Sequence, residues 1–312
     1  MKKVFALILT LAMVLSLAAC GGDKGNDAPP ADNGSQSGDT GSTGGDAQST
    51  EISGNVDLTF AAQEVGTAAY NYAAAIQTAI VKEIPGANIS ITTTSPGGVG
   101  APIIVNGGAQ CDIVMSNSAP AKWSMEEGIL GNAPTPDICA IAGGLGHDFV
   151  NVMFTQKFVD ATGITTVEEL VAQKYPVKLV IKTNGTFGEL AAEKVFEALG
   201  VTLEDVASWG GVVEKTGGDA IKSGLQDDLY DMTIDHIGAG QACNAVIVAG
   251  VDVQLGEETM KKMVEMGYDY VTVEANTWNG QTEEIKTVGS QQVILVPTSL
   301  DYAVAYHMAK AV

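Results

Sequence analysis

One layout of strand, loop and helix occurs twice along this chain, and it limits the fold more than any other feature. The first copy begins with a strand over 56–62, in which apolar and polar residues alternate. A helix follows and stops at Pro85-Gly86, and further strands are predicted over 89–94 and 111–116. Strands alternating with helices predict an α/β fold with a parallel sheet.

The second copy repeats this order. It consists of a strand over 175–181, a loop over 183–188, a helix over 189–200 that stops at Gly200, and a strand over 230–235. A capping box formed by Thr165 or Thr166 with Glu168 or Glu169 opens a helix before this copy. The repetition predicts two similar α/β lobes, each with its own sheet. A last strand and helix lead to Val312, and the helix has no stop signal there, so we expect the chain to continue.

The N-terminus has the pattern of an export signal. Two lysines precede an apolar stretch that is too short to be a stable membrane span, and small residues lead to Cys20. The tetrapeptide Leu17-Ala18-Ala19-Cys20 resembles the lipobox of bacterial lipoproteins, in which the cysteine is acylated. We therefore expect a signal peptide over 1–19 and a lipid-anchored flexible linker over 20–55, which is rich in Gly, Asp, Ser and Pro. A secretory signal with a chance cysteine is the alternative.

The charge of the chain excludes several classes of partner. The formal net charge is −21, and all 16 basic residues are lysines. Such acidity argues against binding to nucleic acid or to an anionic membrane surface. No arginine is present to clamp a carboxylate or phosphate in a bidentate manner. Cys111, Cys139 and Cys243 form no CxxC motif, and we expect them to be small buried thiols.

Each copy of the layout has a corner where a strand passes into a helix. The first corner is Gly66-Thr67-Ala68-Ala69-Tyr70, with no acid to cap the helix, and the second corner is Thr183–Gly188. Ligands bind at the carboxyl ends of strands in open α/β sheets, and helix N-termini attract anions. A helix terminus contributes up to about 2 kcal/mol. Hydrogen bonds to a charged group contribute about 1.5–3 kcal/mol each. With the hydroxyls of Thr67, Ser95 and Thr186, the two corners are predicted to bind a small anion.

Other motifs give weaker signals. The segment Ile237–Gln241 follows a strand but lacks the third glycine of a dinucleotide-binding loop. His147, His236 and His307 have no metal-binding spacing, and we expect core or surface histidines without a metal or cofactor. No GxSxG elbow is present, so the sequence predicts no catalytic residue.

From residue 56 to residue 312 the chain resembles the solute receptors of TRAP transporters of the TAXI type. The resemblance is carried by the order and spacing of several segments: VGTAAYNYAAAI, PGANISITTTSPGGV, CDIVMSN, NGTFGELAAEKVFEALGV, IGAGQACNAVIVAGVDVQL, and EANTWNGQ before TVGSQQVILV. It implies a two-lobed periplasmic-binding-protein type II fold, with two mostly parallel sheets flanked by helices and a ligand cleft between them. Residues 56–154 and 270–312 are expected to form lobe 1, and residues 155–269 lobe 2.

The resemblance also implies the ligand and the site. Members bind glutamate, glutamine or a related small carboxylate and deliver it to a membrane permease. Asn117 takes the place of a common glutamine, and Trp278 belongs to an aromatic-x-Gly-Gln segment. Together with the two corners, the predicted ligand-binding residues are Gly66, Thr67, Ala68, Tyr70, Ser95, Gly97, Asn117, Asn184, Gly185, Thr186, Phe187, Gly238, Gln241 and Trp278.

The expected function is therefore that of an extracytoplasmic receptor, lipid-anchored to the outer face of the cell membrane, and not of an enzyme. Three alternatives remain open. One is an ABC-type receptor of the same fold for a sulfonate or a vitamin precursor. The others are a surface enzyme acting on a small anion, and a structural or adhesive lipoprotein.

Overall fold

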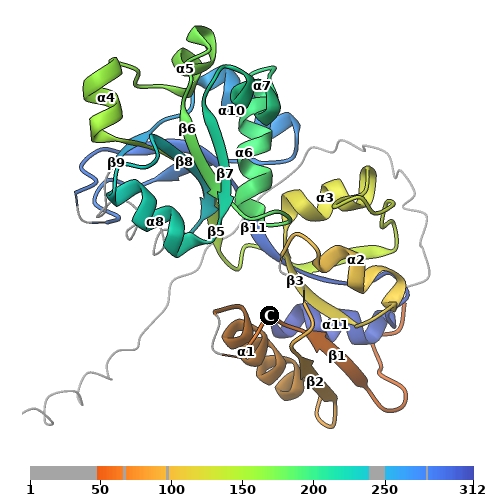
Figure 1. Ribbon diagram of the computed structural model, residues 1–312. Coiled ribbons are helices and arrows are strands. Elements are labelled where there is room, and N and C mark those ends of the chain that lie inside the picture. The colour runs from red at the N-terminus through yellow and green to blue at the C-terminus, as the bar shows by residue number, and fades with distance from the viewer. Residues whose placement is uncertain (1–47, 66–67, 96–97, 239–249, 279) are drawn as a thin grey trace, which may run out of the picture. The chain divides into compact units, whose positions relative to one another are not determined.

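The computed structural model describes residues 48–65, 68–95, 98–238, 250–278 and 280–312. In these residues the strands form an 11-stranded sheet with the main path β2-β1-β3-β11-β5-β8-β6-β7. Helices pack against the strands of this path, so the predicted α/β fold is confirmed (Figure 1). The export signal, Cys20 and most of the predicted linker lie outside the described residues.

A first group of strands contains the first copy of the predicted layout. β1 pairs in parallel with both β2 and β3. The strands of this group are β1 (Asp57–Ala61), β2 (Asn88–Thr92), β3 (Ile113–Asn117) and β4 (Ile138–Ala142). Its helices are α1 (Ala68–Glu83), α2 (Ala101–Val105), η1 (Asn106–Gly108), α3 (Ser118–Glu126) and α11 (Tyr302–Ala311). The predicted strand, helix and strand at the start of the chain are thus confirmed.

A second group contains the second copy. β6 pairs in parallel with both β7 and β8, whereas β5 pairs antiparallel with β8 and β9. The strands are β5 (His147–Thr155), β6 (Lys178–Lys182), β7 (Val212–Thr216), β8 (Met232–Ile237), β9 (Gly250–Val253) and β10 (Asp269–Val273). The helices are α4 (Gln156–Thr162), α5 (Val167–Gln173), α6 (Phe187–Ala198), α7 (Leu203–Ser208), α8 (Gly218–Gln226) and α10 (Glu257–Glu265).

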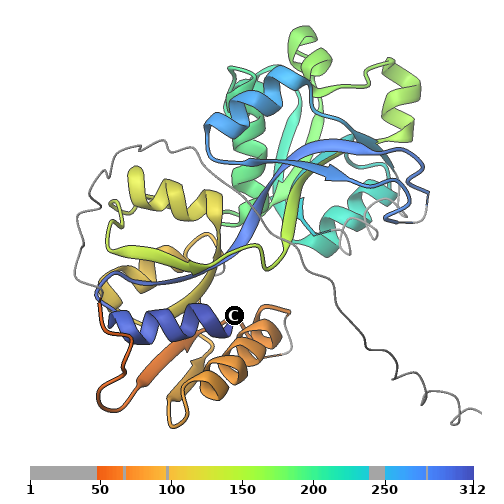
Figure 2. The same cartoon turned by 180° about the vertical axis from the view of Figure 1, so that it is seen from behind.

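The long strand β11 (Ile285–Pro297) belongs to both groups (Figures 1 and 2). Its residues Gln292–Leu295 pair with β3, whereas Gly289–Gln291 pair with β5. The described chain therefore passes from the first group to the second at 143–146, between β4 and β5, and returns within β11.

The strand pairing adds to the sequence prediction in two respects. Residues 147–154, 270–273 and 285–291, which were expected in lobe 1, pair with strands of the second group. β11 changes its partners without a break in its apolar pattern, and the division of the chain into lobes stays a prediction. The sheet is also more mixed than predicted. For example, β10 and β11 pair antiparallel, and so do β5 and β8.

Two large apolar clusters bury the strands, and the cluster of the second group also contains Ala119 and Trp123 of α3. In the first group, Phe60 of β1 and Ile80 of α1 are fully buried together with Ile294 of β11. In the second group, Phe154 of β5, Leu179 of β6 and Phe196 of α6 belong to one buried cluster. The predicted apolar face of the first helix, made of Ala73, Ile76, Ile80 and Ile84, is buried. The two cores hold in place the strand ends at which the predicted corners lie.

The predicted capping box is confirmed at the start of α5. Thr166 Oγ1 accepts a hydrogen bond of 3.1 Å from the Glu169 N–H, and Glu169 Oε2 accepts one of 3.3 Å from the Thr166 N–H. No described helix combines the length and the apolar composition that are needed to cross a bilayer.

Candidate functional site

The first predicted corner is only partly described. Gly66, Thr67 and Gly97 lie outside the described residues. Ala68 is the first residue of α1, whose first turn contains no acidic residue, as expected. Tyr70 is partly buried against the core of the first group, and the Ser95 N–H donates a hydrogen bond of 3.1 Å to the Ala62 carbonyl. The role of this corner in ligand binding stays a prediction.

Asn117 has the most informative position near the first corner. It is the last residue of β3 and the N-cap of α3, and its side chain makes no capping hydrogen bond. The residue is 8% exposed, and its Nδ2 atom has no hydrogen-bond partner among the described residues. Its Oδ1 atom lies close to Gly98, where a Cβ would approach it to 2.8 Å. A buried amide donor without a partner is costly, so this atom is a candidate contact for a ligand.

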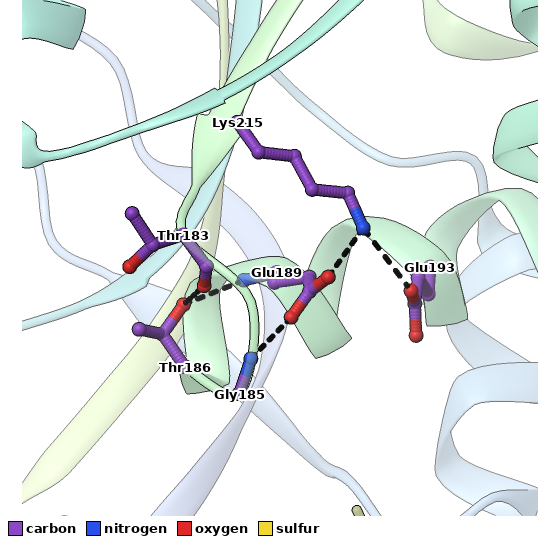
Figure 3. Close-up of polar contacts among 6 residues, drawn as sticks. All are labelled: Thr183, Gly185, Thr186, Glu189, Glu193 and Lys215. Atoms are coloured by element: carbon purple, nitrogen blue, oxygen red, sulfur yellow. Dashed lines mark hydrogen bonds and ion pairs between the residues drawn. The ribbon is translucent and has the colours of Figure 1, made fainter.

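The second corner connects β6 to α6 and is shown in Figure 3. Gly185 has a φ of +80°, a conformation that favours glycine and lets the chain turn into the helix. Thr186 is the N-cap of α6, and its Oγ1 atom accepts a hydrogen bond from the Glu189 N–H at 3.3 Å. The predicted residues Asn184, Gly185, Thr186 and Phe187 are therefore adjacent at one helix N-terminus, as expected.

Two donors of the second corner are engaged within the protein, which the sequence analysis did not predict. The Gly185 N–H donates to Glu189 Oε2 at 2.5 Å, and the Thr186 hydroxyl donates to the Thr183 carbonyl at 2.8 Å. Glu189 Oε1 in turn accepts a hydrogen bond from Lys215 Nζ (Figure 3). The carboxylate of Glu189 thus caps this corner, and the role of the corner in ligand binding stays a prediction.

A second ion pair lies beside this corner. Lys182, the last residue of β6, is 3.3 Å from Asp235 Oδ2 of β8. A Cβ at Gly188 would overlap Asp235 Oδ1, so this carboxylate packs directly on the start of α6. Burial raises the pKa of Asp235, and the Lys182 ammonium partly offsets this increase.

An aromatic cluster packs behind the second corner. The Phe187 ring stacks on the His236 ring with centroids 3.8 Å apart, and Trp123 and Tyr268 contact Phe187 at 6.0 and 6.1 Å. Burial lowers the pKa of His236 to about 3, so its imidazole is neutral at physiological pH. The Nε2 atom of His236 and the hydroxyl of Tyr268 have no hydrogen-bond partner among the described residues. The rings that contact Phe187 are therefore uncharged, but they bring two buried polar atoms without a partner among the described residues.

Two other predicted residues lie near the ends of β8 and β5. Gly238 follows β8, and a Cβ there would lie 3.0 Å from Asp148 Oδ1. Trp278 is 4% exposed and stacks on Phe149 of β5, with ring centroids 6.2 Å apart. It belongs to a small buried cluster with Ile237, so the structure places it in a core. Gln241 lies outside the described residues.

The sequence analysis missed the charged residues of the second corner. One signal was present for Glu189: it follows Thr186 by three residues, which is the spacing of a capping box. No comparable signal was present for Lys182, Lys215 or Asp235, because their contacts depend on the pairing of β6 with β7 and β8.

The remaining expectations concern metals and thiols. In the described part of the chain, no group of three or more His, Cys, Asp or Glu side chains is placed to hold a metal ion. Cys111 is buried, and burial raises the pKa of its thiol to about 11. Cys139 is exposed, so the expectation of a buried thiol was wrong for this residue. Cys243 lies outside the described residues.

Comparisons with known proteins identify the family. The chain belongs to the NMT1-like family, whose profile matches residues 60–312. A search of curated proteins finds no match. The solved structures similar to this chain include solute-binding proteins, and their sequence identity to it is low. A TctC solute-binding protein from Polaromonas, without ligand, has 16% identity over 82% of each chain and a TM-score of 0.49.

Two further structures have a similar extent of match. The periplasmic binding protein BugD has 14% identity, covers 82% of this chain and 81% of its own, and has a TM-score of 0.45. MatC from Rhodopseudomonas palustris, with bound malate, has 12% identity over 82% of each chain and a TM-score of 0.44.

Proposed function

We propose that this protein is an extracytoplasmic solute-binding receptor of a TRAP transporter of the TAXI type. It binds a small organic anion, such as glutamate or a related carboxylate, and delivers it to a membrane permease. Cys20 carries the lipid that anchors it to the outer face of the cell membrane, and residues 20–55 form a flexible linker. The protein acts as a receptor and has no catalytic step.

The observation that carries this proposal is the way in which the two strand groups are connected. The described chain passes between them at 143–146, a segment with three glycines, and again within β11. A receptor that closes on its ligand needs few connections, because its lobes rotate about the segments that join them. The two crossings therefore support a hinge between two ligand-binding lobes.

The residues at the strand ends support a small polar ligand. Asn117, at the end of β3, has a buried amide donor without a partner among the described residues. Gly66, Thr67, Ala68, Tyr70, Ser95 and Gly97 are proposed to complete this side of the site. On the other side we propose contacts with Asn184, Gly185, Thr186, Phe187, Gly238, Gln241 and Trp278, although Trp278 is largely buried.

A second candidate is an ABC-type receptor for a sulfonate or a vitamin precursor. It is kept because the matching family is NMT1-like, a description that does not distinguish between the two transporter types. The gene next to this one distinguishes them, since a large permease indicates a TRAP transporter and an ATPase indicates an ABC transporter.

Replacing Asn117 by alanine is expected to weaken binding of the ligand about tenfold or more, because a hydrogen bond to a charged group contributes about 1.5–3 kcal/mol. Isothermal titration calorimetry with a panel of amino acids, dicarboxylates and sulfonates measures this change. The panel also separates the two candidate receptors by the class of ligand that binds.

Asn88→Ala is the matched control, because Asn88 is an exposed asparagine that bonds to Asp57 on β1. This variant is expected to bind like the wild type. Equal affinity in the Asn117 and Asn88 variants would remove Asn117 from the site. If the wild-type protein binds no member of the panel, the receptor proposal itself is wrong.

A further inference from the structure

The second corner contains a carboxylate at the place where a helix N-terminus attracts an anion. Glu189 is 6% exposed, and its Oε2 atom accepts the hydrogen bond from the Gly185 N–H. Its Oε1 atom is held by Lys215 Nζ (Figure 3). The Gly185 N–H and the Lys215 ammonium, a donor and a cation that could bind an anionic ligand group, are therefore both bound to the Glu189 side chain.

The charges beside the corner are also balanced. Asp235 packs against the start of α6, and its cationic partner is Lys182 at 3.3 Å. Two carboxylates thus face two lysines, and the protein has no arginine that could add a further positive charge. A ligand carboxylate at this corner would lie beside two carboxylates, and both nearby lysines are already in ion pairs with them. Binding of such a ligand group is therefore unfavourable.

A third acidic residue shows that negative charge is already crowded here. Glu193 lies one turn after Glu189 on α6, and its Oε1 atom is 4.0 Å from Lys215 Nζ. Burial raises the pKa of Glu193, and the charge of Glu189 raises it further. The Lys215 ammonium is therefore the cationic partner of two carboxylates, those of Glu189 and Glu193.

The other neighbours of the corner are apolar or neutral. Phe187, the first residue of α6, stacks on the uncharged His236. The side chain of Leu130 lies close to Gly185, where a Cβ would contact it at 3.8 Å. These groups accept an amide or an apolar part of a ligand more readily than an ion.

We infer that the second corner binds an uncharged end of the ligand and that Glu189 is the residue which excludes a second carboxylate there. This inference rests on the proposed receptor function and narrows it. The ligand class is a carboxylate whose far end is neutral, such as a carboxamide. Dicarboxylates are excluded, so among the ligands considered above glutamine fits this site and glutamate does not.

The test uses three acid and amide pairs of nearly equal shape: glutamate with glutamine, aspartate with asparagine, and succinate with succinamate. Wild-type protein is expected to bind the amide of at least one pair about tenfold or more tightly than the acid. Glu189→Gln retains an acceptor for the Gly185 N–H but removes the charge and leaves Lys215 without this countercharge. We expect this variant to lose the preference and to bind the acid about tenfold more tightly than the wild type does.

Glu193→Gln is the matched control, because it removes an equal charge from the same helix without touching Gly185. Its preference is expected to remain that of the wild type, and thermal melting establishes that both variants fold. Tighter binding of an acid than of its amide by the wild type would overturn the inference and leave the receptor proposal standing. An unchanged preference in Glu189→Gln would overturn the role of Glu189. Absence of binding for all six compounds, with folded protein, would overturn both proposals.

Discussion

Replacing His236 by phenylalanine is expected to make the free energy of unfolding fall much less as the pH is lowered. The pKa of His236 is about 3 in the folded protein and about 6.5 when the side chain is exposed to water. Between these values the unfolded chain binds a proton that the folded chain does not, so the free energy of unfolding falls as the pH falls through this window. At pH 4.5 this difference costs the wild-type protein about 2.5 kcal/mol relative to pH 7.5.

Urea unfolding at pH 4.5 and 7.5 measures this effect in the wild type and in His236→Phe. The carboxylates titrate in both proteins, so the difference between the two pH dependences isolates the imidazole. Tyr268→Phe is the control, because it removes the other buried polar group of the aromatic cluster. Burial raises the pKa of Tyr268 well above its usual value, so its hydroxyl stays protonated between pH 4.5 and pH 7.5. Parallel pH dependences for the wild type and His236→Phe would contradict the burial of a neutral imidazole.

The sequence was sufficient to predict the features that depend on local pattern. Alternating apolar residues predicted β1, and a stripe of apolar residues predicted the buried face of α1. A capping box of Thr165 or Thr166 with Glu168 or Glu169 predicted the start of α5. Each of these signals lies within one element or one turn of chain. The same reasoning located the second corner between β6 and α6.

The sequence was insufficient for features that depend on contacts between distant residues. Glu189 could be identified as a helix-capping residue, but its pairing with Lys215 requires β7 to lie beside β6. The stacking of Trp278 on Phe149 likewise joins residues that are far apart in the sequence. The same holds for β11, which exchanges β5 for β3 as its partner within one uninterrupted strand.

Gly188→Ala is expected to destabilise the protein by about 2 kcal/mol, although alanine is the better residue for a helix by about 1 kcal/mol. A Cβ at this position would overlap Asp235 Oδ1 and would lie 2.7 Å from Lys182 Cγ. The Asp235 side chain is 15% exposed and accepts a hydrogen bond from the His236 N–H at 2.8 Å. In the variant, the Asp235 carboxylate must therefore move away from the His236 N–H and from the Lys182 ammonium. The loss of its cation makes a buried carboxylate unfavourable. Urea unfolding at pH 7.5 measures the loss.

A double-mutant cycle with Asp235→Ala separates this clash from any other effect of the methyl group. Once the carboxylate is absent, the new Cβ still lies 2.7 Å from Lys182 Cγ, but the closest clash is removed and helix propensity favours alanine by about 1 kcal/mol. The substitution at Gly188 should thus cost clearly less in the Asp235→Ala background than in the wild type. Equal effects in both would mean that Asp235 does not pack on the start of α6. Only the carboxylate of Glu189 would then lie at the second corner. The repulsion that we expect between the second corner and a ligand carboxylate would be weaker.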